Sequence, residues 1–189
     1  MKITDVRTHL IDQYMFVQVD TDEGISGVGE SGAWAFLEAS KEAVETFKRY
    51  LIGQDPLLIE HHWQYMYRCY HFRGAAIMGA LSAIDIALWD IKGRYYGVPC
   101  YELLGGKVRH KARVYYHVFG SSGEELIQGC KEAKARGFKA VGHLTPFVDS
   151  DRREVMKMES FATKISNAAE RVYQYRETIG NEVDLCIEI

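Results

Sequence analysis

Cysteine, proline and long apolar runs are all scarce in this sequence, and each absence excludes a class of protein. The 189 residues include three prolines and four cysteines. The cysteines are scattered without the paired spacing of a zinc site or a disulfide framework, so reduced thiols are expected. No apolar run approaches the roughly 20 residues that span a bilayer, and the N-terminus lacks the apolar core of a secretion signal. We therefore expect a cytoplasmic protein that does not interact with a membrane.

An excess of positive charge is also missing. The chain carries 23 Lys and Arg against 26 Asp and Glu, which gives a net charge of −3. This charge gives no electrostatic reason to expect nucleic acid as a partner. A hydrophobic content of 47% and a charged content of 26% are typical of a globular domain. The composition is compatible with a cytoplasmic enzyme and does not identify its reaction.

The clearest pattern in the sequence is an apolar helical stripe with an abrupt end. Apolar residues recur at three- and four-residue steps, namely Ala80, Ala83, Ile84, Ala87, Leu88 and Ile91. The small alanines allow another backbone to approach closely. Gly97 and Pro99 then end the helix, because proline cannot continue it and restricts the residue before it. Periodicity alone predicts a buried helix here.

The order of residues in and after this helix resembles a known signature. The matching elements are Ala80, Ser82-Ala83-Ile84-Asp85, Ala87-Leu88, Asp90, Gly93-Arg94, Pro99 and Leu103-Leu104-Gly105, while Cys100 departs from the usual aliphatic residue. By these motifs the chain resembles the enolase superfamily, in the branch of mandelate racemase, muconate lactonizing enzyme and the acid-sugar dehydratases. The resemblance implies an α+β capping domain followed by a (β/α)8 barrel, with Mg²⁺ as cofactor.

Residues 1–111 are expected to form the capping domain. Strand patterns cover residues 6–10, 16–20 and 25–30, with a hairpin turn at 21–24. Helices are expected over 36–52 and 58–70, on either side of the breaker Gly53-Gln54-Asp55-Pro56. The second of these is rich in aromatic residues, carries His61 and His62, and is expected to pack against a partner surface. The signature helix comes third, so three strands precede three helices.

Residues 112–189 show a different pattern, in which strands and helices alternate. Strands are expected over 112–118, 138–144 and 183–189, with helices over 124–136 and 161–179. The resemblance identifies these as the first β/α units of the barrel, which takes about 250 residues in full. We therefore expect the N-terminal part of a longer protein. The alternative, a complete small α/β protein, would leave an apolar edge strand exposed.

Glu188 is the strongest candidate for a functional residue. It is expected at the C-terminal end of its strand, the end at which such barrels place their active sites. Hard cations such as Mg²⁺ prefer carboxylate oxygen ligands. In the family the first metal carboxylate stands at the end of the third barrel strand, and Glu188 matches it by position. The alternative is a solvated acid at a strand end.

The second barrel strand departs from the family pattern. Many members carry a Lys-x-Lys pair there, one lysine serving as base, but the two slots hold Gly142 and Leu144. His143 lies between them and could titrate near neutrality. Strict alternation turns it away from the face of Gly142 and Leu144, so a structural histidine is expected unless the strand end bends. His143 is the candidate catalytic residue of this strand.

A mannonate-dehydratase-like arrangement, which uses an arginine and a tyrosine in place of the lysine pair, fits poorly. The following loop offers Arg152 and Arg153, but no tyrosine lies between Leu144 and Ser160.

Two further residues are candidates for binding the substrate. His117 ends the first barrel strand, where a polar side chain suits a substrate contact. Trp34 follows the third strand of the capping domain, in the loop that closes over the substrate in the family. Core packing is the alternative for each.

The resemblance predicts a Mg²⁺-dependent acid-sugar dehydratase that removes a proton α to a carboxylate and eliminates the β-hydroxyl. A sugar acid is then the expected ligand and a homo-oligomer the expected assembly. A racemase or epimerase of the same superfamily is a second hypothesis, disfavoured by Gly142 and Leu144. A noncatalytic binding or assembly protein is a third, if the chain ends at residue 189.

Overall fold

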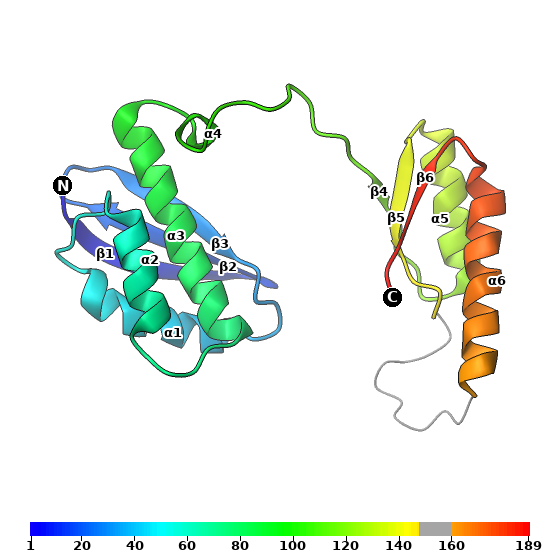
Figure 1. The fold of residues 1–189 in the computed structure, drawn as a ribbon, viewed down its shortest axis with the longest axis horizontal. Helices are drawn as coiled ribbons and strands as arrows, with labels where there is room; N and C mark the ends of the chain where they lie inside the picture. Colours follow the sequence, from blue (N-terminus) through cyan, green and yellow to red (C-terminus); the bar gives the residue numbers. More distant parts are fainter. Residues whose placement is uncertain (148–159) are drawn as a thin grey trace. The chain divides into compact units, whose positions relative to one another are not determined.

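The computed structural model describes residues 1–147 and 160–189, and the chain divides into two compact units, Met1–Val108 and Arg109–Ile189 (Figure 1). The sequence prediction placed this boundary after residue 111. Across both described ranges, no helix combines the length and apolar character needed to cross a membrane.

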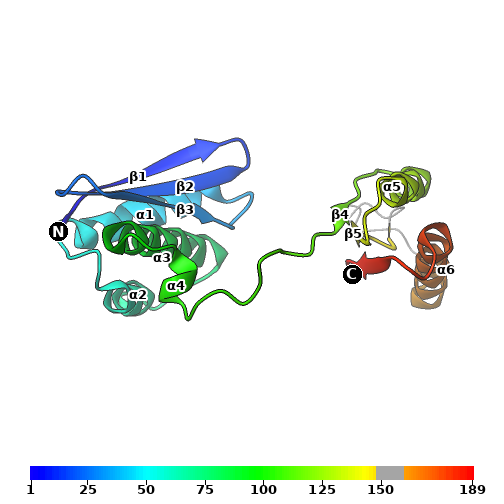
Figure 2. The ribbon, with the colours of Figure 1, turned by 90° about the horizontal axis from the view of Figure 1, so that it is seen from above.

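The first unit begins with a three-stranded antiparallel meander. Its strands β1 (Ile3–Ile11), β2 (Tyr14–Thr21) and β3 (Ser26–Ser31) lie in the order β1-β2-β3. Alternate residues of β2 are buried, among them Met15, Val17 and Val19, which is the pattern of a sheet covered on one face. The helices α1 (Leu37–Leu51), α2 (Ile59–Arg68) and α3 (Ala75–Tyr96) lie on that one side of the sheet (Figure 2). The predicted capping domain is confirmed.

Helix α3 is the centre of this unit. All six residues of the predicted apolar stripe have a relative exposure of 0%. The helix ends at Gly97, whose φ of 68° is left-handed and whose N–H donates to Arg94 O. The N–H of Val98 returns to Gly93 O at 2.9 Å, which completes a C-terminal cap of the kind glycine favours. A short helix, α4 (Cys100–Leu103), follows.

The ring-bearing residues of α2 divide between the interior of this unit, where His62 lies, and its surface, where Tyr65 is 45% exposed. His62 is fully buried, and its Nδ1 lies 2.9 Å from the Tyr50 hydroxyl. Its Nε2 lies 2.8 Å from the carbonyl oxygen of Asp55, so Nε2 carries the proton and Nδ1 accepts from Tyr50. Burial is the main cause that lowers the pKa of His62. The histidine is therefore a structural bridge between α1, α2 and the turn before α2.

This bridge predicts a pH dependence of stability. Between the ordinary histidine pKa of about 6.5 and the lower pKa of His62 in the folded unit, the unfolded chain binds a proton that the folded chain does not. The free energy of unfolding should therefore fall as pH is lowered through this window. Urea unfolding of wild type and His62→Gln at pH 7.5 and 5.5 should show a smaller loss in the variant. His61→Gln, a change at the exposed neighbour, should keep the wild-type loss; equal losses in all three proteins would contradict the assignment.

The second unit is a parallel sheet with helices on one face. The elements are β4 (Tyr116–His117), α5 (Gly123–Ala135), β5 (Ala140–Leu144), α6 (Phe161–Ile179) and β6 (Asp184–Ile187), and the strands lie in the order β4-β5-β6. Apolar side chains between the sheet and the two helices form a second core, which includes Val141, Leu144 and Tyr175. β4 is shorter than the predicted strand over 112–118, because only Tyr116 and His117 pair with β5.

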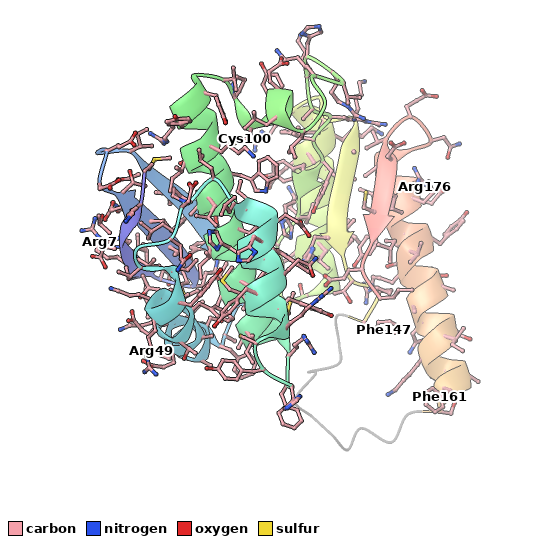
Figure 3. All side chains as sticks on the ribbon, turned by 60° about the vertical axis from the view of Figure 1, so that its left-hand side comes forward. Arg7, Arg49, Cys100, Phe147, Phe161 and Arg176 are labelled. Atoms are coloured by element: carbon pink, nitrogen blue, oxygen red, sulfur yellow. The ribbon has the colours of Figure 1, made fainter. Side chains whose placement is uncertain are left out.

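Local capping sets the ends of both helices in this unit. Ser122 Oγ accepts from the N–H of Glu125, and Ser160 Oγ accepts from the N–H of Thr163. At the other end of α6, Arg176 Nη1 donates to the carbonyl oxygens of Gly180 and Val183 at 2.8 and 2.7 Å. Figure 3 shows Arg176 on α6 beside β6. This side chain ties the turn to the helix and so fixes where β6 begins.

Candidate functional site

Three polar side chains gather at the C-terminal ends of the parallel strands. They are His117 on β4, His143 on β5 and Glu188, which directly follows β6. Because neighbouring parallel strands end at the same edge of a sheet, residues distant in sequence meet there. The backbone holds this edge together through Val118 N–H to Gly142 O at 3.2 Å and Glu188 N–H to Leu144 O at 2.9 Å.

A β-bulge in β5 decides which way His143 faces. Val141 pairs with Leu185 and Leu144 pairs with Ile187, so two residues of β5 oppose the single residue Cys186. His143 has a φ of 60°, a left-handed conformation that costs a non-glycine residue about 1 kcal/mol. The prediction from strict alternation was wrong at this point: the extra residue places His143 on the open face of the sheet and turns Leu144 into the core.

His143 and Glu188 are in direct contact as a result. Nε2 of His143 lies 2.9 Å from Oε2 of Glu188, and the two side chains are 46% and 41% exposed. An imidazole and a carboxylate at this distance can share a proton, and the carboxylate orients the ring. The structure therefore brings together the predicted catalytic residue and the predicted metal ligand.

His117 stands beside this pair. Its ring centroid lies 4.1 Å from that of His143, and on the other side 4.1 Å from that of Phe119, onto which it stacks. Its Nε2 is buried and, among the described residues, has no hydrogen-bond partner. Desolvation is the first cause that lowers the pKa of His117, and the neighbouring His143 adds to it. The predicted contact of His117 with a substrate stays a prediction.

Gly142 shows why no lysine stands in its slot. A Cβ atom built there would lie 2.8 Å from Cβ of Cys186 and 2.8 Å from a ring carbon of Tyr115. The Tyr115 ring therefore occupies the space into which a longer side chain from position 142 would extend. With Leu144 in the core, neither lysine slot of the family pattern can present a base on this face.

The remaining candidates come from other parts of the sequence. Trp34 belongs to the first unit, where its side chain is 63% exposed in the loop between β3 and α1. The backbone N–H of Trp34 donates to Gly32 O at 3.0 Å, and the next residue, Ala35, has a φ of 67°. Its role in substrate binding stays a prediction. Arg152 and Arg153 lie outside the described residues.

Sequence reasoning missed two aromatic neighbours of the site and the contact between His143 and Glu188. Phe119 and Tyr115 carry no chemical signal of their own, and only the fold shows what they pack against. The bulge did leave one trace, since a glycine inside a strand pattern indicates a bulge or a close approach. Gly142 before His143 is such a case.

The chain is similar to a known family and to named proteins. The family model described as "Mandelate racemase / muconate lactonizing enzyme, N-terminal domain" matches residues 2–105. A D-galactonate dehydratase of Xanthomonas campestris pv. campestris (strain B100) is 39% identical over 190 residues, which cover 100% of this chain and 48% of that protein. The chain thus spans about half the length of the curated relatives that it matches.

Two solved structures show the same arrangement of elements. A member of the enolase superfamily from Salmonella Typhimurium is 29% identical with a TM-score of 0.84, over 100% of this chain and 54% of that chain. The 3,6-anhydro-D-galactonate cycloisomerase from Zobellia galactanivorans is 27% identical with a TM-score of 0.76, over 99% and 50%. Relatives with different named activities therefore share this fold.

Proposed function

The chain belongs to the mandelate racemase and muconate lactonizing enzyme family of the enolase superfamily, and we propose that the protein is a Mg²⁺-dependent acid-sugar dehydratase. The proposed substrate is a sugar acid of galactonate, gluconate or mannonate type. The observation that carries the proposal is the contact of His143 with Glu188 at the ends of adjacent parallel strands. The name D-galactonate dehydratase, borne by relatives that match the whole of this chain, supports the substrate class.

Glu188 is the proposed ligand of the metal. Its carboxylate has the donor chemistry that Mg²⁺ prefers, and it stands half-exposed at the strand end. The described ranges contain no group of three or more side chains that could hold an ion. The further ligands are therefore proposed to come from the half of the relatives' length that this chain does not span. When bound, Mg²⁺ would supply positive charge beside the substrate oxygens that become negative.

His143 is the proposed group that takes the proton α to the substrate carboxylate. If Nε2–H donates to Glu188, the neutral ring keeps its lone pair on Nδ1, which is then the nitrogen that can accept a proton. The β-hydroxyl then leaves as water with the proton that the imidazolium returns; this gives an enol, and its rearrangement gives a 2-keto acid. The carboxylate that orients the ring also stabilises the imidazolium that forms.

The two lysine positions of the family pattern on β5 are blocked here, and this disfavours the alternative function, a racemase or epimerase. Such a reaction needs a base on each side of the substrate carbon. Gly142 is covered by the Tyr115 ring and Leu144 is buried in the core, so β5 offers only His143 on this face.

An activity assay tests the proposal. The full-length protein should convert at least one acid sugar of a panel that includes D-galactonate, D-gluconate and D-mannonate to the 2-keto-3-deoxy acid. EDTA should abolish turnover and added Mg²⁺ should restore it. An epimer as the only product would favour the racemase reading, and no turnover of any panel member would contradict both and favour a noncatalytic protein.

The proposal includes a homo-oligomer in the cytoplasm. Large exposed apolar side chains of the first unit support an assembly, since such surfaces are often covered by a partner; the exposed fractions are 85% for Phe72, 63% for Tyr70 and 52% for Leu58. Light scattering of the full-length protein checks this part, and a monomer would overturn it.

A further inference from the structure

The rings of Phe119, His117 and His143 form a column that ends at Glu188. Phe119 and His117 are stacked, with an angle of 21° between their planes, and His117 and His143 are tilted by 58°. Both steps have a centroid separation of 4.1 Å. His143 then reaches Glu188 through Nε2 at 2.9 Å. These contacts are continuous from Phe119, through His117 at the end of β4 and His143 at the end of β5, to Glu188 after β6.

His143 needs support in this position. Its left-handed φ is unfavourable for a residue with a Cβ, and such conformations persist only where the surroundings hold them. The side chain is also 46% exposed, so no dense core encloses it. The Glu188 carboxylate contacts Nε2 at one edge of the ring, and the tilted His117 ring packs beside it.

His117 meets its neighbours through its ring and not through Nε2. Its Nε2 is buried and without a hydrogen-bond partner in the described part of the chain, so this atom neither binds His143 nor faces solvent. What His117 offers to its neighbours is an aromatic surface on each side. A ring of similar shape without the nitrogen atoms should therefore pack against these neighbours in the same way.

We propose that His117 and Phe119 are positioning residues, which hold the His143 imidazole against the Glu188 carboxylate and act on the reaction only through His143. This role replaces a direct contact of His117 Nε2 with the substrate. It rests on the proposed function for its effect on turnover, but its structural part stands on the ring column alone.

The test compares ring-retaining and ring-deleting variants of the full-length protein. His117→Ala should lower kcat by about 10- to 100-fold, the range typical of residues that orient a metal ligand or its partner, with KM unchanged within about 2-fold. His117→Phe keeps the ring and should restore kcat to within about 3-fold of wild type. The kcat of Phe119→Leu should lie between the values for His117→Ala and His117→Phe. The control is Phe161→Leu, at a phenylalanine of α6 that is not part of the column and is 84% exposed, against 79% for Phe119; it should leave kcat unchanged.

A second readout needs neither metal nor substrate. In crystal structures of the metal-free proteins, His117→Phe should keep the contact between His143 Nε2 and Glu188 Oε2, and His117→Ala should lose it. An unmoved His143 in His117→Ala would overturn the proposal. So would a His117→Phe protein as impaired as His117→Ala with a raised KM, because that result assigns the nitrogen to the substrate. If the protein turns over no acid sugar, the proposed function fails while this structural comparison still decides the positioning role.

Discussion

Glu188→Gln in the full-length protein is expected to lower Mg²⁺-dependent turnover by about 10³-fold or more. The change keeps the shape of the side chain but removes the negative charge that the proposed metal needs, and it weakens the acceptor that orients His143. Titration calorimetry should show that the affinity for Mg²⁺ falls together with kcat. The expected loss is large because one side chain is proposed to serve both the metal and the base.

Asp184→Asn is the matched control. Asp184 starts the same strand, is 61% exposed and pairs with Arg113, and an exposed pair of this kind contributes about 0–1 kcal/mol to stability. This variant should retain Mg²⁺ affinity and turnover within about 2-fold. A Glu188→Gln protein that matches Asp184→Asn in both measurements would remove Glu188 from the site.

Gly29→Ala is expected to lower the free energy of unfolding by about 3 kcal/mol or more, at the upper end of overpacking effects. β3 lies so close to α3 that an added Cβ at Gly29 would be 2.0 Å from the carbonyl oxygen of Ala83. Because both partners are backbone, no side-chain rotation can relieve this clash. Urea denaturation followed by circular dichroism measures the loss, which corresponds to a drop in Tm of about 12 °C or more.

Gly32→Ala provides the comparison. A Cβ added at Gly32 would meet no atom within 4 Å, so the free energy of unfolding should change by about 0.5 kcal/mol or less. Equal midpoints for the two variants would show that β3 can move away from α3 without loss of packing.

Patterns that depend on near neighbours in sequence could be predicted well. The apolar stripe of α3 follows a period of three to four residues, and the helix ends where Gly97 adopts a left-handed conformation. Both features could therefore be predicted from the sequence. The alternation of strands and helices after residue 112 could be predicted for the same reason. The identity of the family followed from this local order.

The site was only partly predictable, because its geometry depends on pairing between strands. Glu188 could be placed at a strand end by position alone. The direction of the His143 side chain could not be predicted, because the bulge is defined by how β5 pairs with β6. The burial of His62 is a similar case: its two hydrogen bonds join residues of α1 and of the turn before α2, and no pattern within α2 reveals them.

The bulge in β5 has a consequence for how functional positions are compared between relatives. Strand residues are usually assigned to a face by whether their number is odd or even. One extra residue in β5 reverses that parity from His143 onward, so a lysine at position 144 in a relative without the bulge and His143 here would point to the same side. A functional group can therefore change its place in the sequence while keeping its place in space.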